Sequence, residues 1–198
     1  MLLDLIRPYF VCFISLYIAI NITGKISMFL TLTEKLSFKQ KRRLIRHSII
    51  ATLILMLGFI YIGKYLMLLI GIVASDFKFA GGLLLLFLAI NLLIFKKYDF
   101  MEERRFAHMG IIPLATPLIA TPALFIISMI SFDRFGIVIT LTMLVLNLGI
   151  AWLVLKKFKI VAKLLGERGI SSLSKILNIL LAAFAIMAIR QGLVELII

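Results

Sequence analysis

The sequence contains few acidic residues and very little cysteine, histidine or proline. Its 198 residues include 9 Asp and Glu against 22 Lys and Arg, together with 2 His, 4 Pro and a single cysteine, Cys12. One cysteine excludes a disulfide within the chain and leaves the redox compartment undetermined. No cluster of His, Asp and Glu has the spacing of metal ligands, and there is neither a nucleophile–base pair nor a phosphate-binding glycine loop. These absences argue against an enzyme, an ATP-driven pump, a metal site and a bound cofactor.

The acidic residues all fall at the ends of apolar runs or between them. They are Asp4, Glu34, Asp76, Asp99, Glu102, Glu103, Asp133, Glu167 and Glu195. A carboxylate in the middle of a membrane helix is costly and marks a proton or cation site, and no apolar run contains one. We therefore expect any coupling ion, H⁺ or Na⁺, to use backbone carbonyls, hydroxyl groups or a carboxylate at a helix end.

Apolar residues dominate the composition. They make up 63% of the chain, and the mean hydropathy is +1.17, which is typical of a polytopic helical membrane protein. The net charge of +13 alone would suggest nucleic-acid binding. The basic residues, however, lie in short loops between apolar runs, and there is no basic soluble domain to hold a nucleic acid. The predicted partner is the lipid bilayer and not nucleic acid.

Six apolar runs predict six membrane helices. They cover residues 5–20 with a continuation to 33, then 49–62, 79–95, 109–130, 136–155 and 176–198. A further apolar stretch, residues 65–73, is too short to cross a bilayer. It either extends the second span or forms a short re-entrant or interfacial helix.

Basic residues orient these spans. They gather in the loops after the first, third and fifth spans: Lys35, Lys39, Lys41, Arg42, Arg43 and Arg46; Lys96, Lys97, Arg104 and Arg105; Lys156, Lys157, Lys159, Lys163, Arg168 and Lys175. The positive-inside rule places these three loops in the cytoplasm. The sequence thus predicts a multi-pass plasma-membrane protein with both termini outside.

A polar cluster interrupts the first apolar run. Asn21, Thr23, Gly24 and Lys25 follow one another inside residues 5–33, which are too many for one straight span of about 20 residues. We expect a helix that is broken inside the bilayer. Lipid cannot satisfy the backbone groups that a break exposes, so a break is tolerated only beside a cavity or a partner helix. In transporters this is where substrate binds.

A second stretch, residues 113–122, has similar properties and ends in Thr121-Pro122. Thr23-Gly24 lies 98 residues before Thr121-Pro122, and weaker matches occur at a similar spacing. With three spans in each half, the second half is inverted relative to the first. We predict an all-α fold of two inverted three-helix repeats, residues 1–98 and 109–198, joined by a cytoplasmic linker at 99–108. Helices one and four would be interrupted near the membrane midplane.

Four stretches resemble signatures of the MarC family of membrane proteins. Residues 21–33 read Asn-x-x-Gly-x-x-x-x-Phe-Leu-x-Leu-Thr, and residues 77–85 are similar to the Ala-Gly-Gly segment of that family. Residues 113–122 look like its second broken-helix signature, and residues 180–192 fit its last span. The resemblance implies six helices in two inverted repeats and a link to transport of small neutral amino acids such as glycine and alanine.

The chain departs from the family pattern at both breaks. It has Ile22 where the family usually has Pro, and Lys25 where Asn or a similar residue often stands. The family's Gly-Pro-Gly is replaced by Thr121-Pro122-Ala123. These changes affect the expected substrate more than the expected fold.

Six residues form the predicted substrate site, and each has a structural alternative. Gly24 and Pro122 are the proposed hinges, or simply kink their helices. Asn21, Thr23 and Thr121 bind the carboxylate of an amino acid, or only cap their own helices. Lys25 contacts the substrate, or marks the cytoplasmic end of the first span.

The sequence therefore predicts a secondary transporter of a small polar solute, with a small neutral amino acid as the substrate and alternating access around the two breaks. Two alternatives stay open: a non-transporting assembly or regulatory membrane protein, and an exporter of other small metabolites on the same fold. The sequence is also compatible with a homo-oligomer.

Overall fold

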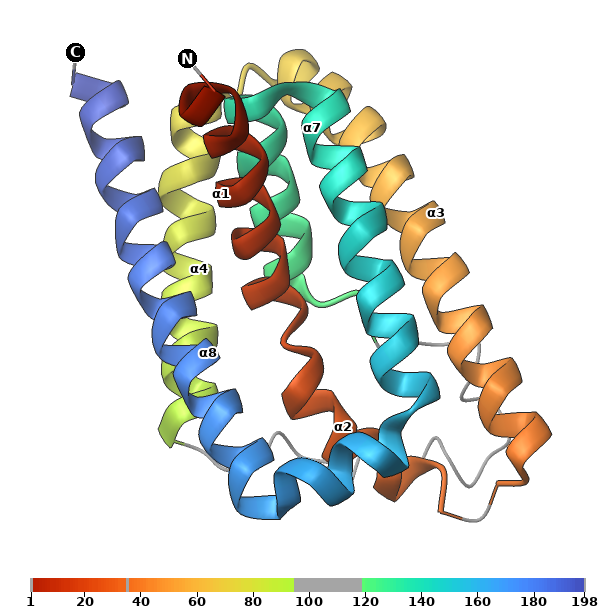
Figure 1. Ribbon diagram of the computed structural model, residues 1–198. Helices are drawn as coiled ribbons and strands as arrows, with labels where there is room; N and C mark the ends of the chain where they lie inside the picture. The colour runs from red at the N-terminus through yellow and green to blue at the C-terminus, as the bar shows by residue number, and fades with distance from the viewer. Residues whose placement is uncertain (1, 35, 95–118, 198) are drawn as a thin grey trace.

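The computed structural model describes residues 2–34, 36–94 and 119–197, and in these ranges the regular structure is entirely helical (Figure 1). The helices are α1 Leu2–Ile20, α2 Ile22–Leu32, α3 Phe38–Ile70, α4 Ala74–Ile94, α7 Pro122–Lys156 and α8 Phe158–Ile197. Two of them contain a glycine with non-helical backbone. Gly136 divides α7 into segments 122–135 and 137–156, and Gly166 separates a short first segment of α8 from its long second one.

Five helices in the described ranges are long and apolar enough to cross a membrane. The first, Ile6–Ile26, runs from α1 through Asn21 into α2. The others are Phe38–Ile70, Ala74–Ile94, Pro122–Lys156 and Arg168–Ile197. Many large apolar side chains face outward, among them Ile54, Leu66, Phe87 and Ile179, which are all about half exposed or more. Soluble proteins do not expose apolar surface on this scale. The predicted all-helical membrane class is thus confirmed.

The ends of α3 differ from the predicted second span. The basic stretch that was predicted as a loop forms its first turns, because Ser37 and Gln40 make a capping box there. At the other end residues 65–70 continue the helix, and Gly71 terminates it in the left-handed conformation (φ 80°). Of the two alternatives for residues 65–73, extension of the second span is therefore correct for 65–70. The predicted linker at 99–108 and the first part of the predicted fourth span, 109–118, lie outside the described residues.

The helices cross the bundle in alternating directions. Figure 1 shows α1 and α2 running away from the end where both termini lie, α3 returning to it, and α4 running away again. Segment 122–135 rises from about half the height of the bundle to that same end, 137–156 runs back, and α8 returns. The basic starts of α3 and α8 therefore lie opposite the termini.

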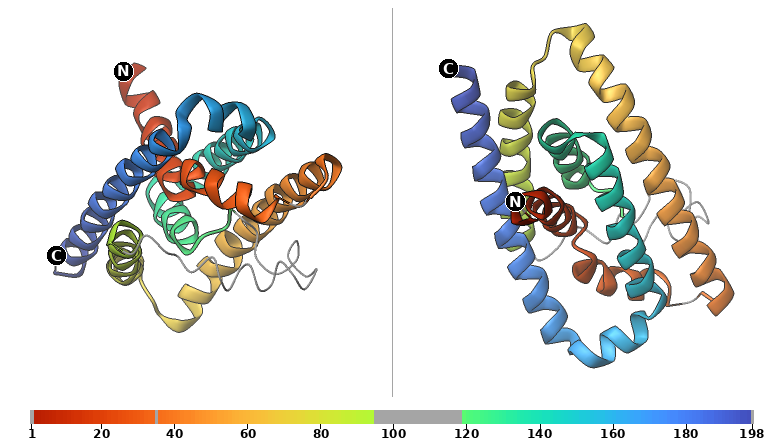
Figure 2. Two further views of the ribbon diagram at one scale, coloured as in Figure 1. Left: turned by 90° about the horizontal axis from the view of Figure 1, so that it is seen from below. Right: turned by 45° about the horizontal axis from the view of Figure 1, so that its top comes forward.

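The helices α4 and α8 lie side by side along much of their length (Figure 2). Glycines make this close approach feasible. A Cβ atom on Gly192 would lie 2.7 Å from the backbone nitrogen of Phe79, and one on Gly82 would lie 2.9 Å from that of Ile189. A Cβ atom on the neighbouring Gly81 would lie 2.8 Å from Cγ2 of Ile126 in α7. The crossing of α4 with α8 thus depends on backbone-to-backbone contact, as small residues permit in membrane helices.

Candidate functional site

The first interruption occurs at Asn21, between α1 and α2. Asn21 adopts the left-handed conformation (φ 44°, ψ 53°) and is the only non-glycine residue with positive φ in the described part of the chain. Asparagine tolerates this conformation better than most residues. Its Oδ1 accepts hydrogen bonds from the backbone N–H of Gly24 and the hydroxyl of Thr23, each at 3.3 Å. Asn21 therefore both breaks the helix and caps the new one.

Gly24, predicted as a hinge, has a different role. It lies in the first turn of α2, and its φ is not positive. A Cβ atom at this position would lie 2.8 Å from Oγ of Ser174 in α8. The chain therefore breaks at Asn21 and not at Gly24, and the missing side chain of Gly24 lets α8 approach the break.

The amide of Asn21 ties the break to α8. Its Nδ2 donates to Oδ1 of Asn178 at 2.8 Å and makes a longer contact of 3.5 Å to Oγ of Ser174. Neither α8 residue is among the six predicted site residues. The position of Asn178 in an apolar span predicts a hydrogen bond to another helix, but not that its partner is Asn21.

A second helix start lies at Thr121, immediately before α7, and the residues immediately before Ile119 lie outside the described part of the chain. Thr121 has extended backbone and is the N-cap, and its Oγ1 accepts from the N–H of Leu124 at 3.3 Å. Pro122 occupies the first helical position, where its missing N–H costs nothing. The same hydroxyl donates to the carbonyl oxygen of Ala19 at 3.2 Å. Thr121 therefore satisfies a backbone acceptor near the end of α1, which lipid could not do.

Lys25 makes the reciprocal contact, from the start of α2 to the residues just before α7. Its side chain is buried, and Nζ donates to the carbonyl oxygen of Ile119 at 3.0 Å. The first membrane-crossing segment ends at Ile26 and α2 continues to Leu32, so Lys25 lies inside a helix but next to the end of that segment. A buried ammonium group in a membrane protein is costly without partners, and the Ile119 carbonyl is one such partner.

The starts of α2 and α7 are therefore joined by two reciprocal hydrogen bonds. Ala19 and Ile119 each lie two residues before an N-cap, and each carbonyl accepts a hydrogen bond from a side chain at the start of the other helix. The N-caps Asn21 and Thr121 are 100 residues apart, close to the spacing of 98 at which the sequence pairs Thr23 with Thr121. We call this arrangement the paired breaks.

Two hollows in the described part of the chain lie away from the paired breaks. One, of about 320 Å³, is an apolar groove between α1 and α8 that includes Phe10, Ile14 and Phe184. The other, of about 520 Å³, lies between the start of α3 and Trp152 of α7 and is lined with basic side chains such as Arg42 and Arg46. None of the six predicted site residues lines either hollow.

Removing the Thr121 hydroxyl should weaken the paired breaks. In Thr121→Val, the N-cap of α7 is lost and the Ala19 carbonyl loses its donor, so we expect the free energy of unfolding to fall by about 2–3 kcal/mol. Thr142→Val is the matched control, because the Thr142 hydroxyl is exposed and bonds only within its own helix. Its expected effect is below about 0.5 kcal/mol. Unfolding of both purified variants in the same detergent measures the difference, and equal losses would contradict the proposed capping.

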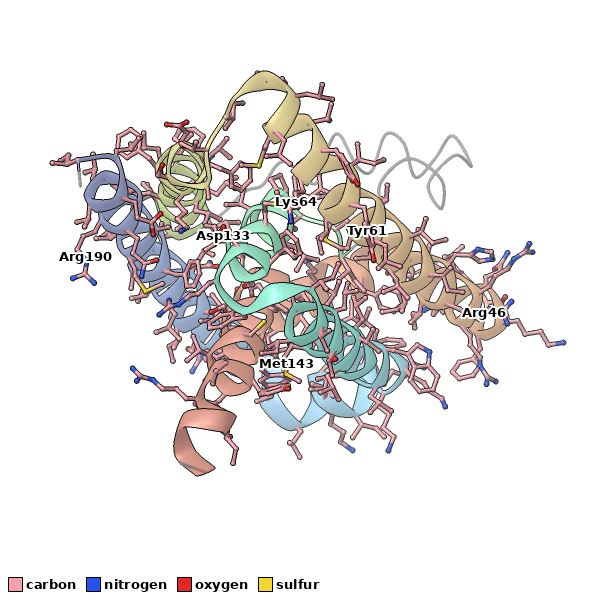
Figure 3. The ribbon with its side chains drawn as sticks, turned by 90° about the horizontal axis from the view of Figure 1, so that it is seen from above. Arg46, Tyr61, Lys64, Asp133, Met143 and Arg190 are labelled. Carbon is pink, nitrogen blue, oxygen red and sulfur yellow. The ribbon has the colours of Figure 1, made fainter. Side chains whose placement is uncertain are left out.

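An ionic cluster that the sequence did not predict lies at the end of the bundle that carries both termini. Nζ of Lys78 in α4 lies 2.8 Å from Oδ2 of Asp133 in α7 and 2.8 Å from Oε2 of Glu195 in α8. Figure 3, which views the bundle from this end, labels Asp133 there. The sequence places Asp133 and Glu195 at span ends, but it does not predict that both pair with Lys78.

Comparison with known proteins places the chain in a family. The family model described as "MarC family integral membrane protein" matches residues 6–197. A UPF0056 membrane protein of Methanocaldococcus jannaschii is 27% identical over 95% of this chain and 97% of the relative. Another, of Archaeoglobus fulgidus, is 29% identical over 94% and 92%. These names assign no substrate, and no solved structure matches the chain. The chain belongs to the MarC family of integral membrane proteins.

Proposed function

We propose that this protein is a secondary transporter, not an enzyme, and that it moves a small polar solute across the membrane. The proposed substrate is a small neutral amino acid such as glycine or alanine, a class that comes from the family resemblance. The observation that carries the proposal is the paired breaks, in which Thr121 and Lys25 each satisfy a carbonyl of the opposite interruption. Interrupted helices that meet inside a bundle are the usual setting of a transporter site.

The directions of the helices support the proposal. Before the undescribed residues 95–118 the chain runs away from the termini, back and away, and after them it runs toward, away and toward (Figure 1). This sequence of directions is what two inverted three-helix repeats would give, with interrupted helices one and four crossing at the centre. Rocking of one repeat against the other would then expose the central site alternately to either side.

The chemistry of the breaks suits a zwitterion. The starts of α2 and α7 direct backbone N–H groups toward the interruptions, and such helix ends bind carboxylates. Asn21, Thr23 and Thr121 would add hydrogen bonds, and Lys25 a positive charge. Gly24 and Pro122 would shape the backbone around the substrate. Any H⁺ or Na⁺ that is coupled to transport would use carbonyls and hydroxyls here or a carboxylate at a helix end.

We further propose a plasma-membrane location with the termini outside. The basic starts of α3 and α8 lie at the end opposite the termini, and positively charged segments stay in the cytoplasm. A homo-oligomer is compatible with the exposed apolar faces of α3 and α4.

One observation favours a second candidate, a non-transporting assembly or regulatory membrane protein. Asn21, Thr23, Lys25 and Thr121 all make hydrogen bonds to atoms of the protein itself. A site built only to hold helices together would have this property. An exporter of other metabolites would share the transporter geometry and differ in the direction of flux.

Flux measurements in proteoliposomes separate these candidates. We expect saturable uptake of labelled glycine or alanine by the intact chain, and loss of most of that uptake in Lys25→Met. Gradients of H⁺ and Na⁺, imposed singly, identify a coupling ion, and preloaded vesicles measure efflux. Absence of flux in both directions for a panel of amino acids, with protein that remains folded, would favour the non-transporting candidate.

A further inference from the structure

Lys78 is held by two carboxylates from two different helices. Its residue is 8% exposed, and its Nζ is 2.8 Å from both oxygens of Glu195 as well as from Oδ2 of Asp133. The three groups have a net charge of −1. They join α4 of the first half of the chain to α7 and α8 of the second. A single lysine therefore connects three helices at the end of the bundle that carries the termini.

The two ion pairs have different surroundings. Lys78 and Glu195 belong to α4 and α8, which are in backbone contact next to these residues. Gly192, one turn before Glu195, is so close to α4 that a Cβ atom there would lie 2.8 Å from the carbonyl oxygen of Ser75. Close-packed glycine contacts of this kind leave two helices little freedom to separate. The Lys78–Glu195 pair thus lies within a rigid unit.

Asp133, by contrast, belongs to segment 122–135, which is bounded by non-helical backbone at both ends. The segment begins at the Thr121 cap and is followed by Gly136, with φ 79° and ψ 172°. No atom lies within 4 Å of a Cβ built on Gly136. Residues at helix ends that take such backbone conformations are where rigid segments pivot. Its close contact with α4 at Gly81 involves only the Ile126 side chain and no backbone atom, so segment 122–135 is the element at this end that is best placed to tilt as a unit.

We propose that the Asp133–Lys78 ion pair is a latch, which opens when segment 122–135 tilts away from α4 during transport, while the Lys78–Glu195 pair stays closed. Leaving a buried charge without a partner is strongly destabilising. Glu195 removes this penalty, because it keeps Lys78 compensated when Asp133 leaves. The Asp133 side chain is 39% exposed, so water can solvate it after release. Since Thr121 lies at the other end of the segment, the latch would couple this end of the bundle to the paired breaks.

The proposal predicts unequal effects for two similar carboxylates. The test uses a chain in which Cys12→Ser removes the native thiol and Ile130→Cys supplies a new one. Ile130 is buried, and it lies one turn from Asp133 on the face of segment 122–135 that also carries Ile126. The rate of its reaction with a membrane-impermeant maleimide reports opening. Asp133→Asn should raise this rate roughly three- to tenfold.

Glu195→Gln removes the partner at the same 2.8 Å distance, yet it should leave the labelling rate within about twofold. Arg190→Gln is the control for a charge change on α8, because Arg190 is exposed and points away from the bundle (Figure 3). Asp133→Glu should return the rate to that of the parent. Equal acceleration by Asp133→Asn and Glu195→Gln, or acceleration by neither, would overturn the latch.

A second measurement tests the latch without the Asp133→Asn variant, in case that variant does not fold. In the parent chain, higher ionic strength should weaken the partly exposed Asp133–Lys78 pair and speed labelling. No salt effect in the parent would count against the latch. The latch rests on the proposed transport function, but labelling needs no substrate. Unequal labelling without amino-acid flux would therefore contradict only the substrate, and flux with equal labelling would contradict only the latch.

Discussion

Replacing Asn21 with alanine is expected to abolish solute flux and to lower the free energy of unfolding by about 2–4 kcal/mol. Three losses combine in Asn21→Ala. The left-handed backbone becomes costly for a residue with a Cβ, the N-cap of α2 disappears, and Oδ1 of Asn178 loses its donor at 2.8 Å. The change should therefore affect both the geometry of the break and its connection to α8. Flux in proteoliposomes and unfolding in detergent are the two measurements.

Two further variants at Asn21 separate these contributions. Asn21→Gly restores the freedom to adopt positive φ and removes only the side-chain hydrogen bonds, so it should recover part of the lost stability. Asn21→Asp retains the acceptor for the Gly24 N–H but loses the donor to Asn178. If glycine and alanine prove equally damaging, the left-handed conformation is not what makes Asn21 important.

Among the glycines of the described residues, Gly192 is the one whose replacement with alanine should cause the largest loss of stability. Its Cβ would lie 2.7 Å from the Phe79 nitrogen and 2.8 Å from the Ser75 carbonyl. These are backbone atoms of α4, which cannot rotate away as a side chain would. Overpacking of this kind costs about 1–3 kcal/mol, and we expect the upper end of that range.

The matched control adds the same methyl group where space is free. A Cβ on Gly149, in α7, meets no atom within 4 Å. Gly149→Ala should therefore change stability by less than about 1 kcal/mol, in the stabilising direction, because alanine is the better helix former. Thermal unfolding of the two variants side by side gives the comparison. Similar behaviour of Gly192→Ala and Gly149→Ala would show that the α4–α8 contact is more adaptable than its geometry indicates.

The helical membrane class could be predicted because it depends on local properties. Long apolar runs mark the part of each helix that faces lipid, and basic residues mark one end of the bundle. Helix ends are a different matter. The apolar run at 49–62 predicted a short second span, whereas α3 covers Phe38–Ile70. The difference arises because a helix continues beyond its apolar residues until it reaches a capping residue. The Ser37 capping box and Gly71 were the local signals for both ends.

The positions of the two helix caps could be predicted from the sequence, but the contacts around them could not. Polar residues inside an apolar run identified Asn21 and Thr121, and both are N-caps in the structure. The hinge was assigned to Gly24 because glycine is the most permissive residue, yet Gly24 serves the approach of Ser174, which lies 150 residues further along the chain. The Lys78–Glu195 contact spans 117 residues. Pairings over such distances depend on how helices pack, and hydrophobic periodicity contains no information about partners.

The reciprocal capping of the two interruptions also has a consequence for biosynthesis. Thr121 donates to a carbonyl that lies 102 residues earlier in the chain. A ribosome that adds about 5–20 residues per second needs roughly 5–20 seconds to supply that donor. Throughout this interval the end of α1 has an acceptor that hydrocarbon cannot satisfy, so water or the insertion machinery has to shield it. In a nascent chain that stops before residue 121, the Ala19 carbonyl would therefore never receive its Thr121 donor. We expect membrane quality control to recognise such a chain by this exposed polar group.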